Sequence, residues 1–527
     1  MSPLKTFLFI ASFGALITTV RAQSTVRKSY PDPVRTPEVE RIMNERIPWA
    51  HKSTRAENNA AETVLPEFVD NSTSIYFPPI INQTGGSCAQ AAGIGYMFTY
   101  EMNRLLHRDA NLSADNRFSY LFTWNLLNGG IDQGGFVEEG LNITRLYGAM
   151  TEADYGTSSW FGFKWVSGYE KYFKALQYRT TSIYSFKNNN EDGIRLIKEY
   201  LYNKGVEGAP GGILTFSTYS TGWTIDENYA GPSHTDYHTL ITRLAVDGAH
   251  AMTIVGYDDL VESYDESGTK HQGAFIVVNS WGKSWADNGR IYLPYHFFTH
   301  RNGHTSDNYL GTTMTGIEVG IHNPLVVFKI RLSYTSRDDL AFVMGASADY
   351  HAAQPAVRAN DYVFSHQGGD HHLLGAYTTK GSFEFALDYT RQLTQNDGLP
   401  STYPLYFLNI ARSHAGKKYG EGTVESVSIT DYTDSAHPRE YFCREAEGST
   451  LPSSNNWFKI PARYWGRWSC HPVRWQSIVD TPSPQTFIIR TANGRYAKLK
   501  FTNYDATTGR LTFDYTLQND GSRIFAR

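Results

Sequence analysis

The chain has 527 residues, which at about 150 residues per domain predicts three or four domains. Lys and Arg total 48 against 52 Asp and Glu, a formal net charge of −4, so the chain lacks the strong positive charge of nucleic-acid-binding domains. Aromatic residues make up 14% of the chain, which supplies material for buried cores and argues against a disordered protein. We therefore expect folded domains and no nucleic-acid partner.

The first 22 residues have the pattern of an export signal. Lys5 gives a positively charged start, residues 6–20 form an apolar run, and a small residue stands at Ala22. An uncleaved anchor helix is the alternative, but the run is shorter than the ~20 residues that span a membrane. No other long apolar run occurs, so we expect no membrane span in the mature protein. The expected location is outside the cytoplasm: secreted, periplasmic or at the cell surface.

Shifts in composition divide the rest of the chain. Residues 23–64 are polar and contain several prolines, which is typical of a linker or a short pro-segment. From 65 to 322, helix-like patterns come first (88–107, 135–147, 191–204) and strand-like patterns follow (212–217, 250–257, 273–279, 289–293). Helices before strands predict an α+β domain, with a helical half and a β half.

The last third of the chain has a different texture. Short alternating runs rich in β-branched and aromatic residues, separated by turn residues, predict all-β antiparallel sandwich-type domains. We place an accessory β-sandwich at 323–435 and a C-terminal β module at 436–527, which closes with a hairpin meander. These modules are expected to serve stability, substrate recruitment or association with the cell surface.

Three cysteines are present, an odd number for an exported protein. Cys443 and Cys470 are close in sequence, so a disulfide between them is expected, with two buried thiols as the alternative. Cys88 is then left unpaired, far upstream. An unpaired thiol in an exported protein is a candidate nucleophile.

The sequence around Cys88 favours a reactive thiol. Gly85 and Gly86 allow a tight turn, Ser87 is a good N-cap, and the following residues are apolar almost all round, as in a buried helix. Cys88 would occupy the first turn of that helix, where unpaired N–H groups and the helix dipole favour a thiolate. An inert, packed cysteine is the alternative.

A thiolate needs a base and a group that orients the base. His250 stands before the strand-like run in GAHAMTIVGYDD, and Asn279 ends another run in AFIVVNSWGKSW. Either residue alone is weak evidence, because 17 histidines occur in the chain. The order Cys88, His250, Asn279, each in a matching local context, carries the hypothesis.

These segments resemble the papain family of cysteine peptidases. The resemblance rests on LPEFVDN (65–71), NQTGGSC (82–88), GGFVEEGLNITRLYGAMTEADYG (134–156), HAMTIVGY (250–257) and NSWGKSW followed by NGRIYL (279–293). It covers residues 65–322, about half of the chain. The resemblance implies a papain-like catalytic domain that hydrolyses peptide bonds in protein or peptide substrates without a cofactor or metal.

The resemblance also implies a role for each matching residue. Cys88 would attack the peptide carbonyl as a thiolate paired with the His250 imidazolium, and Asn279 would orient that ring beneath Trp281. The backbone N–H of Cys88 and the side-chain amide of Gln83 would stabilise the oxyanion.

Substrate binding can be assigned in the same way. Gly134 and Gly135 would pair their backbone with an extended substrate, strand to strand. Ala249, beside His250, would border the subsite for the second residue before the scissile bond.

The chain departs from the family pattern in several places. The usual C-G-[SA]-C-[WY] signature becomes Gly85-Gly86-Ser87-Cys88-Ala89, without the first cysteine or the aromatic residue. Gln83 stands five positions before the nucleophile where the family has six, and Asn82 stands at six. We favour Gln83 as the oxyanion donor, but Asn82 stays open. Asn82 also begins an N-x-T glycosylation site, and since a glycan there would block the cleft, a bacterial protein is favoured.

Two further features lie near the C-terminal end. The motif HQGGDHH (366–372) has several metal-ligand side chains, but an exposed turn is the more common reading because no second ligand cluster accompanies it. The final meander weakly resembles the haem-capturing proteins of the HmuY type over about the last forty residues, with no identifiable haem ligand.

Two other functions compete with an active peptidase. A papain-like fold could serve as a catalytically silent binding module or adhesin, although intact Cys88, His250 and Asn279 argue against it. A transglutaminase-like acyl transferase is the third option, which the NSWG context of Asn279 disfavours.

Overall fold

The structure is a computed structural model that describes residues 37, 40, 47–48, 64–156, 163–299, 310–311, 313–375, 381–390, 403–412, 420–451, 457–462, 486–490, 495–505, 508 and 510–518. The chain divides into two compact units, Met1–Ala462 and Arg463–Arg527. The expected signal peptide and most of the expected pro-segment lie outside the described residues. Among the helices of the described residues, none is long and apolar enough to cross a membrane.

The helices of the first unit are short and occur mainly before residue 204. They are η3 (Asn71–Thr73), α2 (Cys88–Gln90), η4 (Ala91–Phe98), α3 (Thr99–Leu106), η5 (Ala114–Asn116), α4 (Tyr120–Leu127), α5 (Val137–Leu146), α6 (Glu152–Tyr155), α7 (Tyr169–Ala175), α8 (Glu191–Asn203), α9 (His296–Thr299) and η6 (Arg337–Asp339).

A ten-stranded, mostly antiparallel sheet forms the β half of the predicted α+β domain. Its strands are β1 (Ile47–Pro48), β2 (Phe68–Asp70), β3 (Tyr178–Lys187), β4 (Leu214–Thr221), β5 (Thr224–Asp226), β6 (Leu240–Arg243), β7 (Asp247–Tyr264), β8 (Lys270–Val278), β9 (Arg290–Pro294) and β10 (Thr313–Ile321). The order is β1-β3-β10-β4-β7-β8-β9-β6-β5, and β2 pairs with β7. The long strand β7 is therefore central, with β4 on one side and β8 on the other.

Two further antiparallel sheets occupy residues 324–462, here called the two-sheet region. One sheet has the order β14-β11-β16-β17 with β18 paired to β16, and the other has the order β13-β12-β15-β19. Their strands are β11 (Val326–Tyr334), β12 (Leu340–Ser347), β13 (Val357–Asn360), β14 (Phe383–Asp388), β15 (Leu405–Arg412), β16 (Gly422–Asp431), β17 (Arg439–Phe442), β18 (Thr450–Leu451) and β19 (Phe458–Pro461). Strands β17 to β19 pair within these sheets, so residues 439–461 belong to the two-sheet region. The C-terminal module was expected to begin at 436, before these strands.

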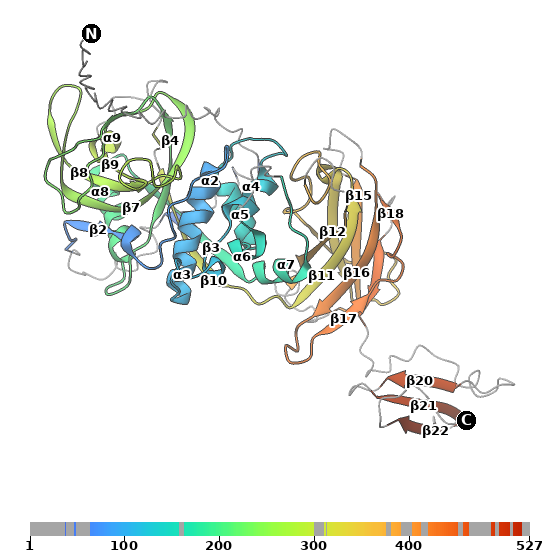
Figure 1. Cartoon of the computed structure of the whole chain (residues 1–527). Coiled ribbons are helices and arrows are strands. Elements are labelled where there is room, and N and C mark those ends of the chain that lie inside the picture. Colours follow the sequence, from blue (N-terminus) through green and yellow to red (C-terminus); the bar gives the residue numbers. More distant parts are fainter. Residues whose placement is uncertain are drawn as a thin grey trace, which may run out of the picture. The chain divides into compact units, whose positions relative to one another are not determined.

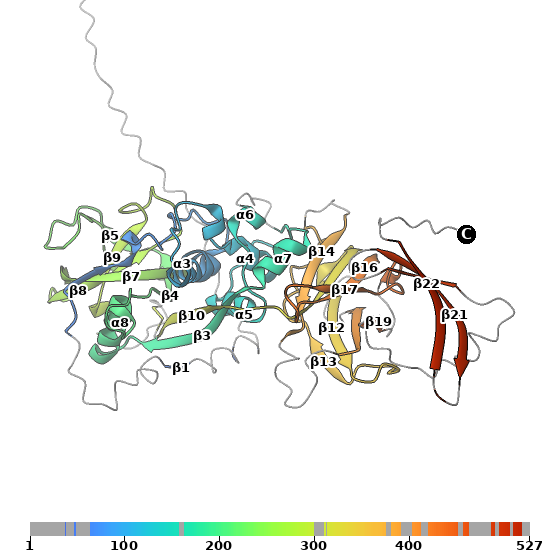
Figure 2. The same ribbon diagram turned by 90° about the horizontal axis from the view of Figure 1, so that it is seen from below.

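Helices α2 to α7, here called the helical half, lie between the large sheet and the two-sheet region (Figures 1 and 2). The run from α2 through α3 is buried from Cys88 to Asn103, including a few polar side chains such as Glu101 and Asn103, and it shares a core with the large sheet. Its middle part, η4, is a π-helix of eight residues. The predicted helix at 88–107 is thus present as three segments, two α-helical and one π-helical, that end at Leu106.

One apolar core joins the helical half to the two-sheet region. Phe364 of the two-sheet region meets Tyr147 and Tyr172 of the helical half, with ring centroids 5.1 and 5.6 Å apart. Tyr147 also donates a hydrogen bond of 2.7 Å to the Ala386 carbonyl. The buried cluster includes residues on both sides of position 323, so no break in packing coincides with that expected boundary.

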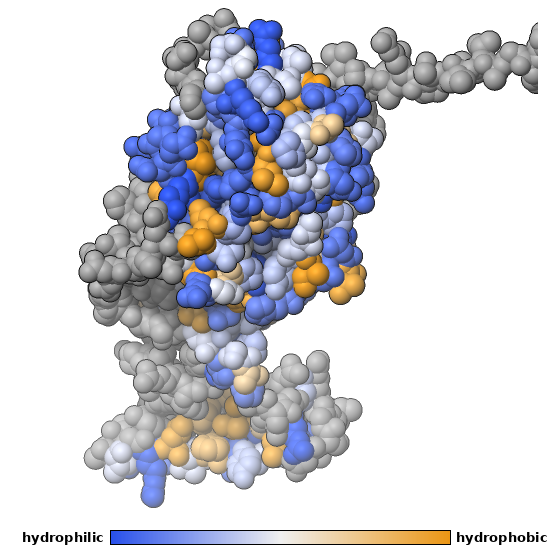
Figure 3. Space-filling view, turned by 90° about the vertical axis from the view of Figure 1, so that its left-hand side faces the viewer, coloured by the Kyte–Doolittle hydropathy of each residue, from blue (hydrophilic) through white to orange (hydrophobic). Residues whose placement is uncertain are grey.

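The second unit contains a small antiparallel sheet of β20 (Thr486–Arg490), β21 (Tyr496–Asp505) and β22 (Arg510–Gln518). Its register places apolar residues together on one face: Phe487, Ile489, Ala497, Leu499, Phe501, Phe513, Tyr515 and Leu517. Phe513 and Tyr515 are exposed on this face. Figure 3 shows apolar side chains gathered at this sheet, whereas on the visible face of the first unit they are scattered among hydrophilic ones.

The expected disulfide between Cys443 and Cys470 is not supported. Cys443 is a free thiol, buried beneath β16, where its backbone N–H donates to the Val427 carbonyl. Cys470 lies outside the described residues. Burial in an apolar core satisfies Cys443 as a small hydrophobic side chain, the alternative that the sequence analysis kept open.

Candidate active site

The nucleophile loop, defined as residues 82–88, brings Cys88 to the first position of α2. Gly85 has φ of +51°, and its missing side chain leaves room for the carboxylate of Asp132. Asp132 accepts a hydrogen bond of 2.8 Å from the Gly86 N–H. A Cβ on Gly86 would lie 2.8 Å from the Gly134 nitrogen, so this glycine permits close approach of the loop to the Gly134–Gly135 backbone.

The thiol of Cys88 is buried, and burial raises its pKa above the ordinary value. Hydrogen bonds from the backbone N–H groups of Ala251, Ala89 and Cys88 itself act in the opposite direction but do not outweigh burial. The position at the helix start, which was expected to favour a thiolate, is therefore only one influence on the Cys88 thiol, and burial acts against it. The bond from Ala251 places the thiol against β7, next to the residue that follows His250.

His250 and Asn279 lie side by side on neighbouring strands. His250 is on β7 and Asn279 directly follows β8, and both are buried. The Nε2 atom of His250 lies 2.8 Å from Oδ1 of Asn279, which also accepts the Ser280 N–H at 2.7 Å. Since the Ser280 contact requires an oxygen at that position, the amide oxygen of Asn279 faces His250 and Nε2 carries the proton of this hydrogen bond.

A cluster of indole rings surrounds this pair. Trp281 lies against His250 with ring centroids 4.8 Å apart and an angle of 31° between the planes. Trp223 is 6.3 Å from His250 and 5.8 Å from Trp281, and Trp285 packs against both tryptophans. These rings exclude water from the His250–Asn279 hydrogen bond, which strengthens it. Sequence reasoning missed Trp223, because no motif surrounds it.

The two candidate oxyanion donors have different surroundings. Gln83 accepts a hydrogen bond from the Ser280 hydroxyl at 2.6 Å and donates one to the Gly85 carbonyl at 2.8 Å. Its amide is thus held between the nucleophile loop and the residue after Asn279. Asn82 is exposed, and its side chain lies beside Gly282.

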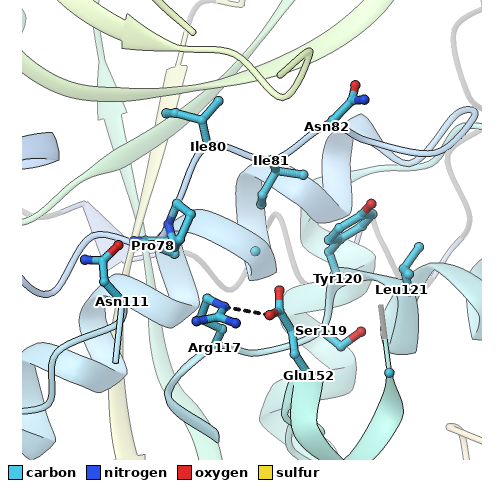
Figure 4. Close-up of a pocket in the computed structure, with 13 residues that line it drawn as sticks. Pro78, Ile80, Ile81, Asn82, Asn111, Arg117, Ser119, Tyr120, Leu121 and Glu152 are labelled. Carbon is cyan, nitrogen blue, oxygen red and sulfur yellow. Dashed lines mark hydrogen bonds and ion pairs between the residues drawn. The ribbon is translucent and has the colours of Figure 1, made fainter. Parts of the chain in front are cut away.

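Asn82 also borders a pocket of about 490 Å³. Figure 4 shows the ion pair of Arg117 and Glu152 on one side of this pocket and Ile80 and Ile81 near the other, with the Asn82 side chain directed away from the ion pair. Arg117 Nε and Glu152 Oε2 are 2.6 Å apart. Of the predicted site residues, Asn82 alone is among those lining the pocket.

The remaining predicted residues lie around Cys88 and His250. Gly134 and Gly135 are half-buried beside the nucleophile loop, and Ala249 is half-buried on β7 opposite Tyr219 of β4. Gln90 is buried and donates to the Phe136 carbonyl at 2.9 Å, in the region where the family's aromatic residue is missing.

One supporting residue has no sequence signal. The hydroxyl of Tyr96, in η4, accepts the Ile81 N–H at 2.7 Å and donates to the Asn279 carbonyl at 3.0 Å. It therefore links the start of the nucleophile loop to the strand end that carries Asn279. Tyr96 lies in a uniformly apolar stretch, where a tyrosine is indistinguishable from other core residues by pattern alone.

The motif HQGGDHH folds as a loop against the helical half. His371 is buried, with Nε2 2.7 Å from the Gly130 carbonyl and its ring stacked on Phe163. Among the described residues, no group of three or more His, Cys, Asp and Glu side chains is arranged to hold a metal ion.

Comparisons with known proteins find two kinds of similarity. The chain is similar at low identity to papain-like cysteine proteases of known structure. Bromelain from Ananas comosus, in complex with the E64 inhibitor, has a TM-score of 0.31 and 16% identity over 48% of this chain and 99% of its own. Xylellain, a cysteine protease from Xylella fastidiosa, has a TM-score of 0.35 and 17% identity over 55% and 95%. The proform of the ragweed cysteine protease Amb a 11 has a TM-score of 0.32 and 18% identity over 49% and 67%.

The C-terminal end matches a family model instead. The model of the HmuY protein family matches residues 375–515. The predicted HmuY resemblance is therefore confirmed, and it begins well before the last forty residues. A search of curated proteins finds no match.

Proposed function

We propose that the protein is a cysteine peptidase in which Cys88 is the nucleophile and His250 is the base. The observation that carries the proposal is the buried hydrogen bond of 2.8 Å between His250 Nε2 and Asn279 Oδ1, with the Cys88 thiol bonded to the backbone of Ala251. This arrangement leaves the other ring nitrogen of His250 to exchange a proton with the thiol.

The reaction follows from these positions. Cys88 transfers its proton to Nδ1 of His250, and the thiolate attacks the peptide carbonyl carbon. The imidazolium then gives that proton to the leaving amine, and a thioester remains on Cys88. Water, deprotonated by His250, hydrolyses the thioester and restores the thiol. Because burial raises the pKa of the isolated thiol, the charge on the imidazolium is needed to stabilise the thiolate.

The oxyanion is stabilised by two N–H donors. The backbone N–H of Cys88 is at the start of a helix, where such groups lack intrahelical partners. Gln83 supplies the second donor, because Ser280 and Gly85 hold its amide beside the nucleophile loop. We prefer it to the exposed Asn82 for that reason.

Peptide or protein segments are the proposed substrates. An extended substrate would pair with the backbone of Gly134 and Gly135 and place a side chain near Ala249. Export through residues 1–22, a pro-segment at 23–64 and cell-surface association through the β-domains are part of this proposal. The pattern of residues 6–20 supports export, and the polar composition of 23–64 with its prolines supports a pro-segment. The HmuY match supports a role for the β-domains outside the cytoplasm.

Labelling with the epoxysuccinyl thiol reagent E-64 tests the proposal. Wild type should be labelled once and should cleave peptides, whereas Cys88→Ala and His250→Ala should lose both properties. Cys443→Ser is the matched control and should be labelled like wild type, since Cys443 lies in the core. Failure to label folded wild type, also after removal of residues 23–64, would favour the alternative of a catalytically silent binding module.

A further inference from the structure

The loop of residues 365–375, here called the docking loop, joins the two-sheet region to the helical half. The Gly368 N–H donates to the Leu126 carbonyl at 2.9 Å, and His371 Nε2 lies 2.7 Å from the Gly130 carbonyl. A Cβ on Gly369 would lie 2.0 Å from the Gly129 carbonyl oxygen, so the two glycine-rich backbones are in direct contact. This loop includes the HQGGDHH motif.

The docking loop is itself held rigidly by Arg337 of η6. Arg337 is fully buried, and its Nε donates to the Gly368 carbonyl at 2.9 Å while its backbone N–H donates to the His371 carbonyl at 2.9 Å. Nη1 donates to the Phe163 carbonyl at 2.6 Å, and the guanidinium lies 4.4 Å from the Trp165 ring centroid. The buried cation thus contacts carbonyls and an aromatic face on both sides of the junction, while its Nη2 has no hydrogen-bond partner among the described residues.

The segment that the docking loop contacts leads directly to the proposed substrate site. Gly129 and Gly130 have positive φ, and from Gly130 the chain reaches Gly134 in four residues. Residues 131–133 are exposed, so few packing contacts fix this stretch. Its position depends on the Gly130 carbonyl, on Asp132 bonded to Gly86, and on a bond of 3.0 Å from Trp124 Nε1 to the Gln133 carbonyl.

We propose that His371 is a positioning residue for substrate binding: through the Gly130 carbonyl, the docking loop of the two-sheet region fixes the Gly134–Gly135 backbone that receives the peptide. This inference rests on the proposed function. It assigns the two-sheet region a part in building the cleft, and it gives the HQGGDHH motif a role that involves no metal.

The positioning role requires a hydrogen-bond donor at residue 371 that reaches the Gly130 carbonyl. His371 Nε2 carries its proton toward the Gly130 carbonyl, and the stack on Phe163, with centroids 5.0 Å apart, orients the ring. Loss of this bond would remove one anchor of the stretch 131–135, of which residues 131–133 are exposed, while the bonds at Asp132 and Gln133 remain. The Cys88–His250 pair, held by α2 and β7, should keep its geometry. Binding of the peptide should suffer, and the reactivity of the thiol should not.

The test compares two amides of different reach. Glutamine places its Nε2 near the position of the histidine Nε2, whereas asparagine is one methylene shorter. We expect H371N to raise the KM for a peptide about tenfold relative to H371Q, with H371Q near wild type, which is the effect of one neutral hydrogen bond. The rate of Cys88 alkylation by iodoacetamide should be the same in both variants, and H372N and H372Q serve as the matched control pair in the same loop.

The possible outcomes separate the two proposals. Wild type that neither cleaves peptides nor reacts at Cys88 would overturn the proposed function. Cleavage by wild type with equal KM in H371N and H371Q would overturn the positioning role alone. A loss of the folded state in H371N, measured by its thermal midpoint against H371Q, would also overturn it, because His371 would then serve stability only.

Discussion

Two glycine-rich loops of this protein, the nucleophile loop and the docking loop, contain side chains of types that often act in catalysis or metal binding. The structure places these side chains in different environments. In the nucleophile loop, close backbone packing at Gly86 presents Cys88 to the strand that carries His250. In the docking loop, equally close packing at Gly369 presents His371 to a backbone carbonyl. His250 meets a side-chain oxygen that fixes its tautomer and leaves one ring nitrogen for chemistry, whereas His371 is committed to holding the chain.

The role of each histidine follows from the groups that its two ring nitrogens face. In the proposed mechanism, the bond from Nε2 to Asn279 orients the His250 ring as a base for the thiol, whereas a carbonyl and an aromatic stack make His371 a structural anchor. The number of histidines in the HQGGDHH motif says nothing on this point. Substitutions that remove the contacts holding either loop test this contrast.

The largest effect is expected at the base of the docking loop. Phe364 precedes this loop and is 1% exposed in the core shared by the helical half and the two-sheet region. Phe364→Ala should lower the free energy of unfolding by about 3–5 kcal/mol, because it removes a large buried side chain and leaves a cavity. Since one core serves both regions, loss of peptidase activity and loss of secondary structure on heating should coincide.

Phe442→Ala is the control for this prediction, because Phe442 is 63% exposed on β17. It should change the free energy of unfolding by less than about 0.5 kcal/mol. Two separate thermal transitions in Phe364→Ala, with activity surviving the first, would contradict a shared core.

The next effect is expected in the nucleophile loop. Gln83→Ala should lower kcat about 10²–10³-fold, the loss found for one oxyanion donor, whereas Asn82→Ala should leave kcat within about threefold of wild type. Alkylation of Cys88 by iodoacetamide should be unchanged in both variants, because that reaction forms no oxyanion. A larger loss in Asn82→Ala than in Gln83→Ala would reverse the assignment.

The arrangement of the candidate site could be predicted from the sequence where its geometry is local. Asn279 and Trp281 are two positions apart at a strand end, and Gly85 to Cys88 form one turn before a helix, so short motifs carry their arrangement. The partners of His371 could not be predicted, because Gly130 is distant in sequence and shares no pattern with it. Trp223 was missed for the same reason, and Cys443 is a free thiol although another cysteine is close to it in the sequence.

The smallest effect is a dependence of stability on pH at Asp361, whose side chain anchors the turn into the docking loop. Its Oδ2 accepts the Phe364 N–H at 2.7 Å and the Ser365 N–H at 3.1 Å, and burial raises the pKa of this carboxyl from 3.8 to about 6. The unfolded chain therefore loses the proton near pH 3.8 while the folded chain keeps it to about pH 6. The stability that this group contributes is complete below the lower pKa and is lost as pH rises through the higher one.

Asp361→Asn keeps an acceptor oxygen for both N–H groups and cannot ionise. Relative to wild type, it should gain up to about 3 kcal/mol of unfolding free energy between about pH 4 and pH 7, measured by urea unfolding at several pH values. A constant difference between the two proteins, or a gain toward low pH, would contradict this account of Asp361. The KM for peptides should stay unchanged, because the docking loop is held by the same two hydrogen bonds whether the acceptor is a carboxyl or an amide.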